Sequence, residues 1–141
     1  MRRQLIALAA VLLPAQIADA HALFPGQQVV LTAGERGIAY FQAVNDRKDV
    51  SEYVVELFDF GTWMPTRYAV ASPDRVTVPS AANAFTGVAP RRITVMVDLD
   101  GKPERIVRVC TKSVARRDPF RAASTSVNTR VCSKLIVRRL Q

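Results

Sequence analysis

Short runs of strand-forming residues, each followed by turn residues, most constrain what this chain can fold into. After residue 20, segments rich in Val, Ile, Thr, Tyr and Phe are separated by Gly, Pro, Asn and Asp, and helical periodicity is nearly absent. This pattern is typical of a β-sandwich, and 141 residues make one ordinary domain. We therefore predict an all-β, single-domain, seven-stranded immunoglobulin-like β-sandwich. Its expected strands are residues 28–31, 38–44, 53–60, 68–70 with 76–78, 93–99, 105–114 and 127–137.

The pattern within these segments also predicts their environment. Alternation places apolar side chains on one face of a strand. The side chains expected to face the core in two of the strands are Val55, Leu57, Phe58, Ile93, Val95 and Val97. Pro73 has no backbone donor, so the interrupted segment around it is expected at a sheet edge. Asp100 followed by Gly101 predicts a hairpin with a type I′ turn.

The first twenty residues are typical of a secretory signal. They combine a cationic start, an apolar run over residues 5–13 and small residues ending at Ala20. The apolar run is shorter than the roughly 20 residues that cross a bilayer, and no later segment could cross one, so stable membrane insertion is not expected. We predict a signal peptide at residues 1–20 and the domain at residues 21–141. Cleavage after Ala22 and a buried N-terminal helix are the alternatives.

The chain contains two cysteines, Cys110 and Cys132. In an exported domain, two cysteines indicate one disulfide. They fall in the sixth and seventh predicted strands, and antiparallel pairing could bring them opposite each other in a non-hydrogen-bonded pair that a disulfide can bridge. On the chain-entropy model, such a bridge contributes roughly 3 kcal/mol. Two free thiols remain the alternative if the chain is not exported.

Charge is distributed unevenly along the sequence. Residues 21–90 carry five basic and seven acidic side chains, whereas residues 91–141 carry thirteen basic and four acidic ones. A basic half can attract anionic partners. Export makes nucleic acid a poor match, and we expect none as a partner. An anionic lipid, a cell-wall polymer, an acidic protein and a solvated basic face remain open interpretations.

The side chains that conventional catalysis requires are missing. His21 is the single histidine, so no Ser–His or Cys–His pair is expected, and no glycine-rich phosphate loop is present. Two cysteines and one histidine are also too few for a zinc site. If cleavage leaves His21 at the N-terminus, it could chelate Cu(II), but a second histidine is lacking, and a disordered terminal residue is the simpler interpretation. We predict a protein that is not an enzyme and has no cofactor or metal.

The last predicted strand ends with residues 132–139, Cys-Ser-Lys-Leu-Ile-Val-Arg-Arg. These residues resemble the strand that ends the first domain of the periplasmic pilus chaperones of the chaperone–usher pathway, the PapD-like proteins. Residues 109–114 are similar to the preceding strand, and both cysteines fall where the subgroup with a bridged loop places its own. Earlier segments match in order, so the likeness covers residues 27–139.

The resemblance implies a binding function in the periplasm. Family members lend their last strand to a pilin subunit that lacks one, through backbone hydrogen bonds and alternate side chains. A lysine and an arginine anchor the C-terminal carboxylate of the subunit. Lys134 matches the lysine, and Gln28 stands at the arginine position on the first strand. The donor positions, where large aliphatic residues are usual, are Thr125, Val127 and Thr129.

The resemblance thus predicts a periplasmic chaperone-like protein whose partner is a protein subunit of a pilus or envelope assembly. The neutral Gln28, the polar donor positions and the absence of the family's second domain after Leu140 favour an alternative. In that alternative, the protein is a secreted single-domain structural or accessory component of an envelope, pilus or secretion assembly. It would use its sandwich edge or its basic face.

Overall fold

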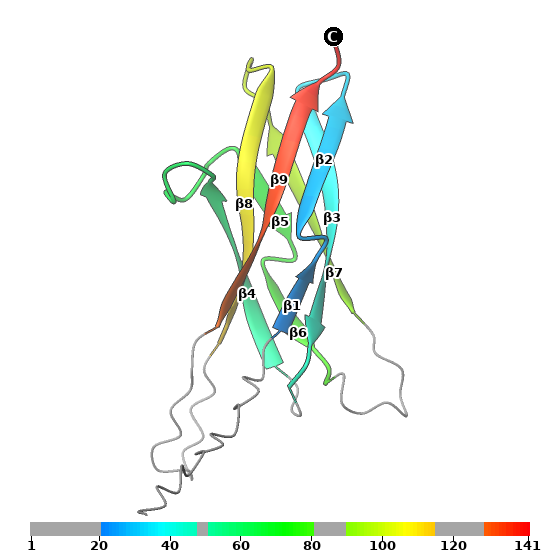
Figure 1. Ribbon diagram of the computed structural model, residues 1–141, viewed down its shortest axis with the longest axis vertical. Helices are drawn as coiled ribbons and strands as arrows, with labels where there is room; N and C mark the ends of the chain where they lie inside the picture. The colour runs from blue at the N-terminus through cyan, green and yellow to red at the C-terminus, as the bar shows by residue number, and fades with distance from the viewer. Residues whose placement is uncertain (1–20, 48–50, 81–89, 115–128) are drawn as a thin grey trace, which may run out of the picture.

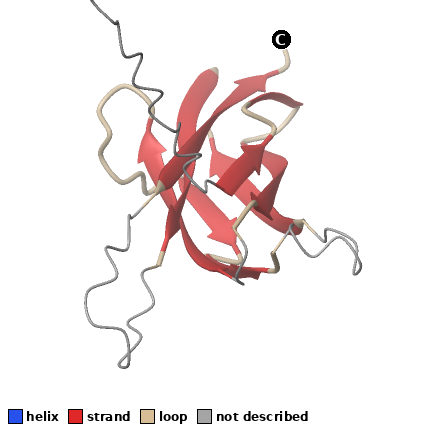
Figure 2. Cartoon of the chain, turned by 60° about the horizontal axis from the view of Figure 1, so that its bottom comes forward, coloured by secondary structure: helices blue, strands red, loops and turns tan. Residues whose placement is uncertain are grey.

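The computed structural model describes residues 21–47, 51–80, 90–114 and 129–141. These residues form nine strands and no helix, arranged as two facing sheets (Figures 1 and 2). The all-β, single-domain immunoglobulin-like sandwich is therefore confirmed. The strands are β1 (His21–Phe24), β2 (Gln27–Thr32), β3 (Arg36–Asn45), β4 (Ser51–Asp59), β5 (Ala69–Ser72), β6 (Arg75–Val78), β7 (Arg91–Asp98), β8 (Glu104–Ser113) and β9 (Arg130–Arg139).

Consecutive strands lie in different sheets, except for β8 and β9. The four-stranded sheet has the order β1-β3-β7-β5, and the five-stranded sheet has the order β2-β9-β8-β4-β6. The chain passes from one sheet to the other between β1 and β2, at Pro25 and Gly26, and again between β5 and β6. Each of these four strands lies at an edge. All pairings are antiparallel except that of β2, which runs parallel to β9.

The core follows the two-residue alternation of the strands. In β3, Ala39, Phe41 and Ala43 are fully buried, and the residues between them are exposed. The predicted inward face of β7 is confirmed, since its alternate apolar residues are fully buried. The fully buried side chains that the five-stranded sheet contributes include Tyr53, Val78, Val107, Val109, Leu135 and Val137.

The two layers approach each other closely at Gly37. A Cβ at this position would lie 2.4 Å from Cγ1 of Val137 and 3.3 Å from Cγ1 of Val30. Interior packing leaves no room for an additional methyl group at such a contact. The absence of a side chain at Gly37 therefore allows β3 to pack against β2 and β9.

Three sequence expectations about the strands are wrong. β1 was not predicted, and the expected fourth strand is two strands, β5 and β6, in different sheets. Pro73 lies between them, and both are edge strands as expected. Phe58 was expected in the core. Because Tyr53 and Val55 face inward, alternation turns Phe58 outward, where its ring lies 5.8 Å from that of Trp63.

The predicted turn forms, but it does not close a hairpin. Asp100 and Gly101 have φ values of 50° and 75°, as a type I′ turn requires, and Lys102 N donates to the carbonyl of Leu99 at 3.0 Å. The turn joins β7 in one sheet to β8 in the other. Local residues determine the turn type, whereas strand pairing depends on the packing of the whole sandwich, so the hairpin prediction is wrong.

Candidate partner-binding edge

The candidate site is the first part of β9, where one edge of the strand has no neighbour. β8 pairs with β9 over its whole length, from Arg130 to Arg138. β2 pairs with it only from Lys134 onward, starting with Gln27 opposite Lys134. Residues 130–133 therefore have a strand on one side alone in the described part of the chain. We call this segment the open edge.

The backbone hydrogen bonds show which groups face the open edge. In a strand, the N–H and C=O of one residue point to the same side, and successive residues alternate. Thr129 accepts a bond from Ser113 of β8 at 2.9 Å, and Lys134 N donates toward the β2 side, to Gly26 O at 3.0 Å. Odd-numbered residues of β9 thus face β8. The N–H and C=O groups of Arg130 and Cys132 point to the uncovered side.

The disulfide fixes this arrangement. Cys110 and Cys132 lie directly opposite each other in the β8–β9 ladder, and a disulfide joins them with their Cα atoms 4.0 Å apart. The predicted bridge between the last two strands is confirmed. Since the backbone groups of Cys132 face away from β8, this is a non-hydrogen-bonded pair, as the sequence suggested. The bridge ties β9 to β8 without using any group of the open edge.

Lys134 lies on the outer face of the five-stranded sheet, where the open edge meets β2. Its register partner on β8 is Arg108, and its register partner on β2 is Gln27. The Nζ of Lys134 lies 4.7 Å from the centre of the Phe60 ring. The Arg108 guanidinium lies 4.3 Å from the same ring and 3.7 Å from the ring of Trp63, which is 47% exposed.

Sequence reasoning did not identify Arg108, although a signal was available. In an antiparallel ladder, the residue numbers of opposed positions have a constant sum. The Cys110–Cys132 pair sets that sum, and it places Arg108 opposite Lys134. A disulfide assumed from sequence was therefore sufficient to align the two strands and to bring the two cations together. The contact of Trp63 with Arg108 places its ring on the face that carries Lys134.

The other predicted partner-binding residues lie elsewhere. Gln28 is opposite the buried Leu135 and faces inward, and its Oε1 is buried without a hydrogen-bond partner. The first-strand residue beside Lys134 is thus Gln27, because a shift of one residue reverses the face of a strand. Thr129 is described, and its hydroxyl contacts neighbours inside the sandwich. Thr125 and Val127 lie outside the described residues.

Thr129 belongs to a polar cluster around His21 that sequence reasoning missed. His21 is 3% exposed in β1. Its Nδ1 lies 3.2 Å from the Thr129 hydroxyl, and its Nε2 lies 3.0 Å from the carbonyl oxygen of Thr111. Arg47 donates to the same Thr129 hydroxyl at 3.0 Å. The interpretation of residue 21 as disordered is therefore wrong. Nothing in a single terminal histidine indicated that it would be buried.

The surroundings of His21 favour its neutral form. Burial lowers its pKa below the ordinary value of 6.5. Three effects are smaller than that of burial: a hydrogen bond to the Thr111 backbone raises the pKa, the charge of Arg47 lowers it, and the charge of Asp46 raises it. Both ring nitrogens already contact protein oxygens. Among the residues that the structure describes, no three His, Cys, Asp or Glu side chains gather to hold a metal ion.

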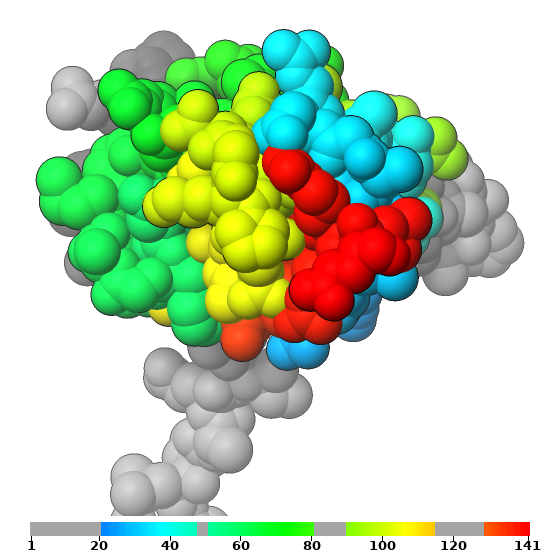
Figure 3. Space-filling view, turned by 90° about the horizontal axis from the view of Figure 1, so that it is seen from above, coloured from blue at the N-terminus to red at the C-terminus, as the bar shows by residue number. Residues whose placement is uncertain are grey.

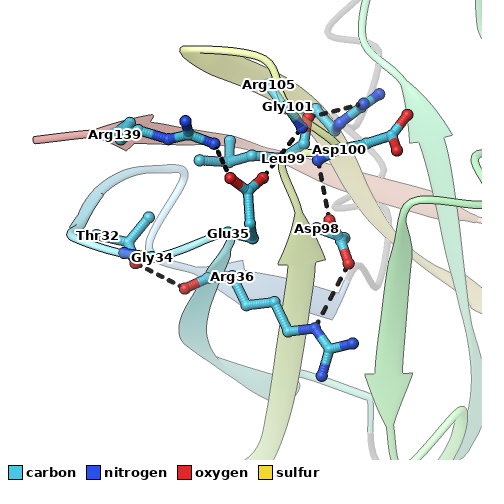
Figure 4. Close-up of polar contacts among 10 residues, drawn as sticks. All are labelled: Thr32, Gly34, Glu35, Arg36, Asp98, Leu99, Asp100, Gly101, Arg105 and Arg139. Atoms are coloured by element: carbon cyan, nitrogen blue, oxygen red, sulfur yellow. Dashed lines mark hydrogen bonds and ion pairs between the residues drawn. The ribbon is translucent and has the colours of Figure 1, made fainter.

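At the other end of the sandwich, charged side chains fasten the end of β9 (Figure 4). Glu35 accepts hydrogen bonds from Arg139 and, at 3.0 Å, from the backbone of Gly101. Leu140 N donates to Thr32 O at 2.8 Å. Seen from above, the last residues lie between β8 and the segment around β2 (Figure 3). The second part of β9 is thus held on both sides, in contrast to the open edge.

No protein-family model matches this sequence, and no curated protein does. Solved structures match its fold. The class 5 fimbriae chaperone CfaA aligns with a TM-score of 0.64 and 14% identity, over 86% of this chain and 57% of that chain. A chain from the Salmonella enterica SafA pilin–SafB chaperone complex gives 0.62 and 15%, over 85% and 54%. The chain has the PapD-like fold.

The PapD-like fold also occurs outside pilus assembly. Domain 7 of human CEP192, a PapD-like domain, aligns with a TM-score of 0.61 and 7% identity, over 98% of this chain and 99% of that domain. This chain spans only a little over half the length of the two fimbrial structures described above. In the described residues, no helix has the length and apolar character to cross a membrane.

Proposed function

We propose that this protein is a periplasmic chaperone-like protein that binds a pilus or surface subunit by offering the open edge of β9 to a strand of that subunit. The observation that carries the proposal is the division of β9 at Lys134, with an uncovered edge before it and β2 after it. An unpaired strand edge is a template for adding a strand from another chain.

The size of the open edge indicates what else binding requires. Arg130 and Cys132 offer two N–H and two C=O groups, and each new hydrogen bond contributes about 1 kcal/mol net. Roughly 4 kcal/mol corresponds to a dissociation constant of only about 1 mM. A stable complex therefore needs a further anchor. In the proposal, Lys134 supplies it through a charge-assisted hydrogen bond to the terminal carboxylate of the subunit.

The periplasm is the proposed location for two reasons. The predicted signal peptide would direct export, and the Cys110–Cys132 disulfide requires an oxidising compartment. In the same compartment, an incompletely folded subunit would meet the open edge before assembly.

Arg130→Pro tests strand addition directly. The N–H of residue 130 faces the open edge, so proline removes a donor from the partner and leaves the β8 ladder intact. Arg130→Ala is the matched control, because it also loses the ion pair with Glu56. We expect affinity-tagged Arg130→Pro and Lys134→Ala to recover at least tenfold less subunit from periplasmic extract, measured by quantitative mass spectrometry. Arg130→Ala and Lys112→Ala should recover it as the parent does. Equal recovery by the proline variant would contradict the proposal.

One observation favours the alternative role as an accessory component. On the outer face of the four-stranded sheet, Ile38, Met96 and Val70 are register neighbours on three adjacent strands, and they are 48%, 37% and 60% exposed. Such a row could pack against another protein of an assembly. In that role the open edge would remain unused, and Arg130→Pro would recover the same proteins as Arg130→Ala.

A further inference from the structure

The strongest unexplained feature is a pair of like charges on adjacent strands. Arg108 and Lys134 are direct register partners on the outer face of β8 and β9. Like charges in this position are destabilising. The neighbouring cations of β9 are neutralised, since Arg130 Nε donates to Glu56 at 2.9 Å and Arg138 Nε donates to Glu104 at 2.7 Å. In the described residues, neither Arg108 nor Lys134 forms an ion pair.

Aromatic rings hold these two cations in place of carboxylates. Arg108 stacks on Trp63 and lies over Phe60, and its Nη2 donates to the Phe60 carbonyl at 3.0 Å. Lys134 lies over the same Phe60 ring. The Nε of Arg108 is buried and has no hydrogen-bond partner. Both charges are thus positioned by ring faces, and among the described residues Arg108 Nη1 and Lys134 Nζ donate to no protein acceptor.

We propose that Arg108 and Lys134 together form a carboxylate-binding site, with Arg108 as the second cation that neither Gln27 nor Gln28 can supply. This inference rests on the proposed function, which places the C-terminal carboxylate of the added strand at Lys134, and it adds Arg108 to that anchor. The guanidinium can engage a carboxylate with two parallel N–H donors, while the lysine contributes a point charge. The site lies where the open edge ends, so a strand paired along that edge brings its last residue to both cations.

The test compares one peptide in two forms. A synthetic octapeptide with alternating valines is prepared with a free C-terminal carboxylate and with a C-terminal amide. Trp63 is the single tryptophan and stacks on Arg108, so its fluorescence reports binding at the site. We expect the parent protein to bind the acid form about tenfold more tightly than the amide. Arg108→Gln and Lys134→Gln should each reduce that ratio to about one, while Lys112→Gln, a cation elsewhere on the face, should preserve it.

The outcomes separate this inference from the proposed function. If Arg108→Gln keeps the parent ratio while Lys134→Gln loses it, the role of Arg108 is wrong and strand addition remains supported. If the parent binds neither form, both proposals are wrong. Arg108→Lys is the control for a folding defect, because lysine keeps the positive charge but lacks the planar guanidinium with its parallel N–H donors. An intermediate ratio, together with an unchanged unfolding temperature, would support bidentate recognition.

Discussion

Both ring nitrogens of His21 form hydrogen bonds, and a neutral ring can satisfy both of them. With the proton on Nδ1, the ring donates to the Thr129 hydroxyl, which itself donates to Ser113, and Nε2 accepts from the Thr111 hydroxyl at 2.9 Å. Adding a second proton would remove the acceptor that the neutral ring offers. It would also place a positive charge beside the Arg47 guanidinium in a buried site. Protonation therefore opposes folding.

This arrangement predicts a dependence of stability on pH. The pKa of His21 in the folded protein lies below its ordinary value of 6.5, so the unfolded chain takes up the proton first as the pH falls. The His21 contribution is complete above pH 6.5. It is lost as the pH decreases below 6.5, with a slope of at most about 1.4 kcal/mol per unit, and it levels off below the folded pKa. Urea unfolding between pH 7.5 and 5 measures it.

His21→Gln provides the control for this titration. Glutamine keeps a donor and an acceptor at the site and does not titrate in this range. We expect the variant to be less stable than the parent at pH 7.5 and to show a flatter stability profile between pH 7.5 and 5. An identical slope in both proteins would assign the effect to other groups.

At the scale of the strands, the contact at Gly37 determines how closely the edge strand β2 can lie against the body of the sandwich. Val137 of β9 and Val30 of β2 both contact the space that a Cβ would occupy. Valine has a stiff side chain, so neither residue can move aside without leaving its preferred rotamer. Packing at this one position therefore supports the strand that covers the second part of β9.

Gly37→Ala is expected to destabilise the protein by about 1–3 kcal/mol, the usual cost of overpacking a core. Gly61→Ala is the matched control, because a Cβ there meets nothing within 4 Å. Chemical denaturation of the two variants gives the comparison. If β2 is displaced in Gly37→Ala, hydrogen exchange should also increase at the amides of β9 that face β2, those of residues 134, 136 and 138. Equal stability of the two variants would show that Val137 can move at little cost.

The strands also show how far sequence reasoning extends. Alternation was sufficient to predict β3, β4 and β7–β9 approximately, because a half-buried strand repeats every two residues. It could not predict that β1 and β2, or β5 and β6, belong to different sheets, since that choice depends on distant partners. At the site, Lys134 was predicted from the sequence motif of the last strand. Identifying Arg108 required the register of β8 against β9, and the inward direction of Gln28 depends on its register with β9, because a one-residue shift reverses its face.

For the molecule as a whole, β1 bears on where the chain would begin after cleavage of the proposed signal peptide. The strand has four residues, His21–Phe24, and all of them pair with β3. Cleavage after Ala22 would remove half of this strand and would leave the Thr111 carbonyl and the Thr129 hydroxyl without their buried partner. Loss of partners for buried polar groups typically costs 1–3 kcal/mol each. Cleavage after Ala20 preserves these contacts.

We therefore predict that the exported protein begins at His21. Intact mass measurement or N-terminal sequencing of periplasmic material tests this directly. A protein engineered to begin at Leu23 should unfold at a lower urea concentration than one that begins at His21. Exported material that begins at Leu23, or equal stability of the two forms, would contradict the prediction.

The parallel placement of β2 has a consequence for which guests the protein can accept. A strand that pairs along the open edge with its carboxylate at Lys134 must run in the same direction as β9, and so in line with β2. Its final residue then meets Gly26, where the chain crosses between sheets. An internal segment of a guest would have to pass through that crossover. The crossover would thus admit the C-terminal end of a polypeptide and sterically exclude an internal segment, whatever the sequence of either.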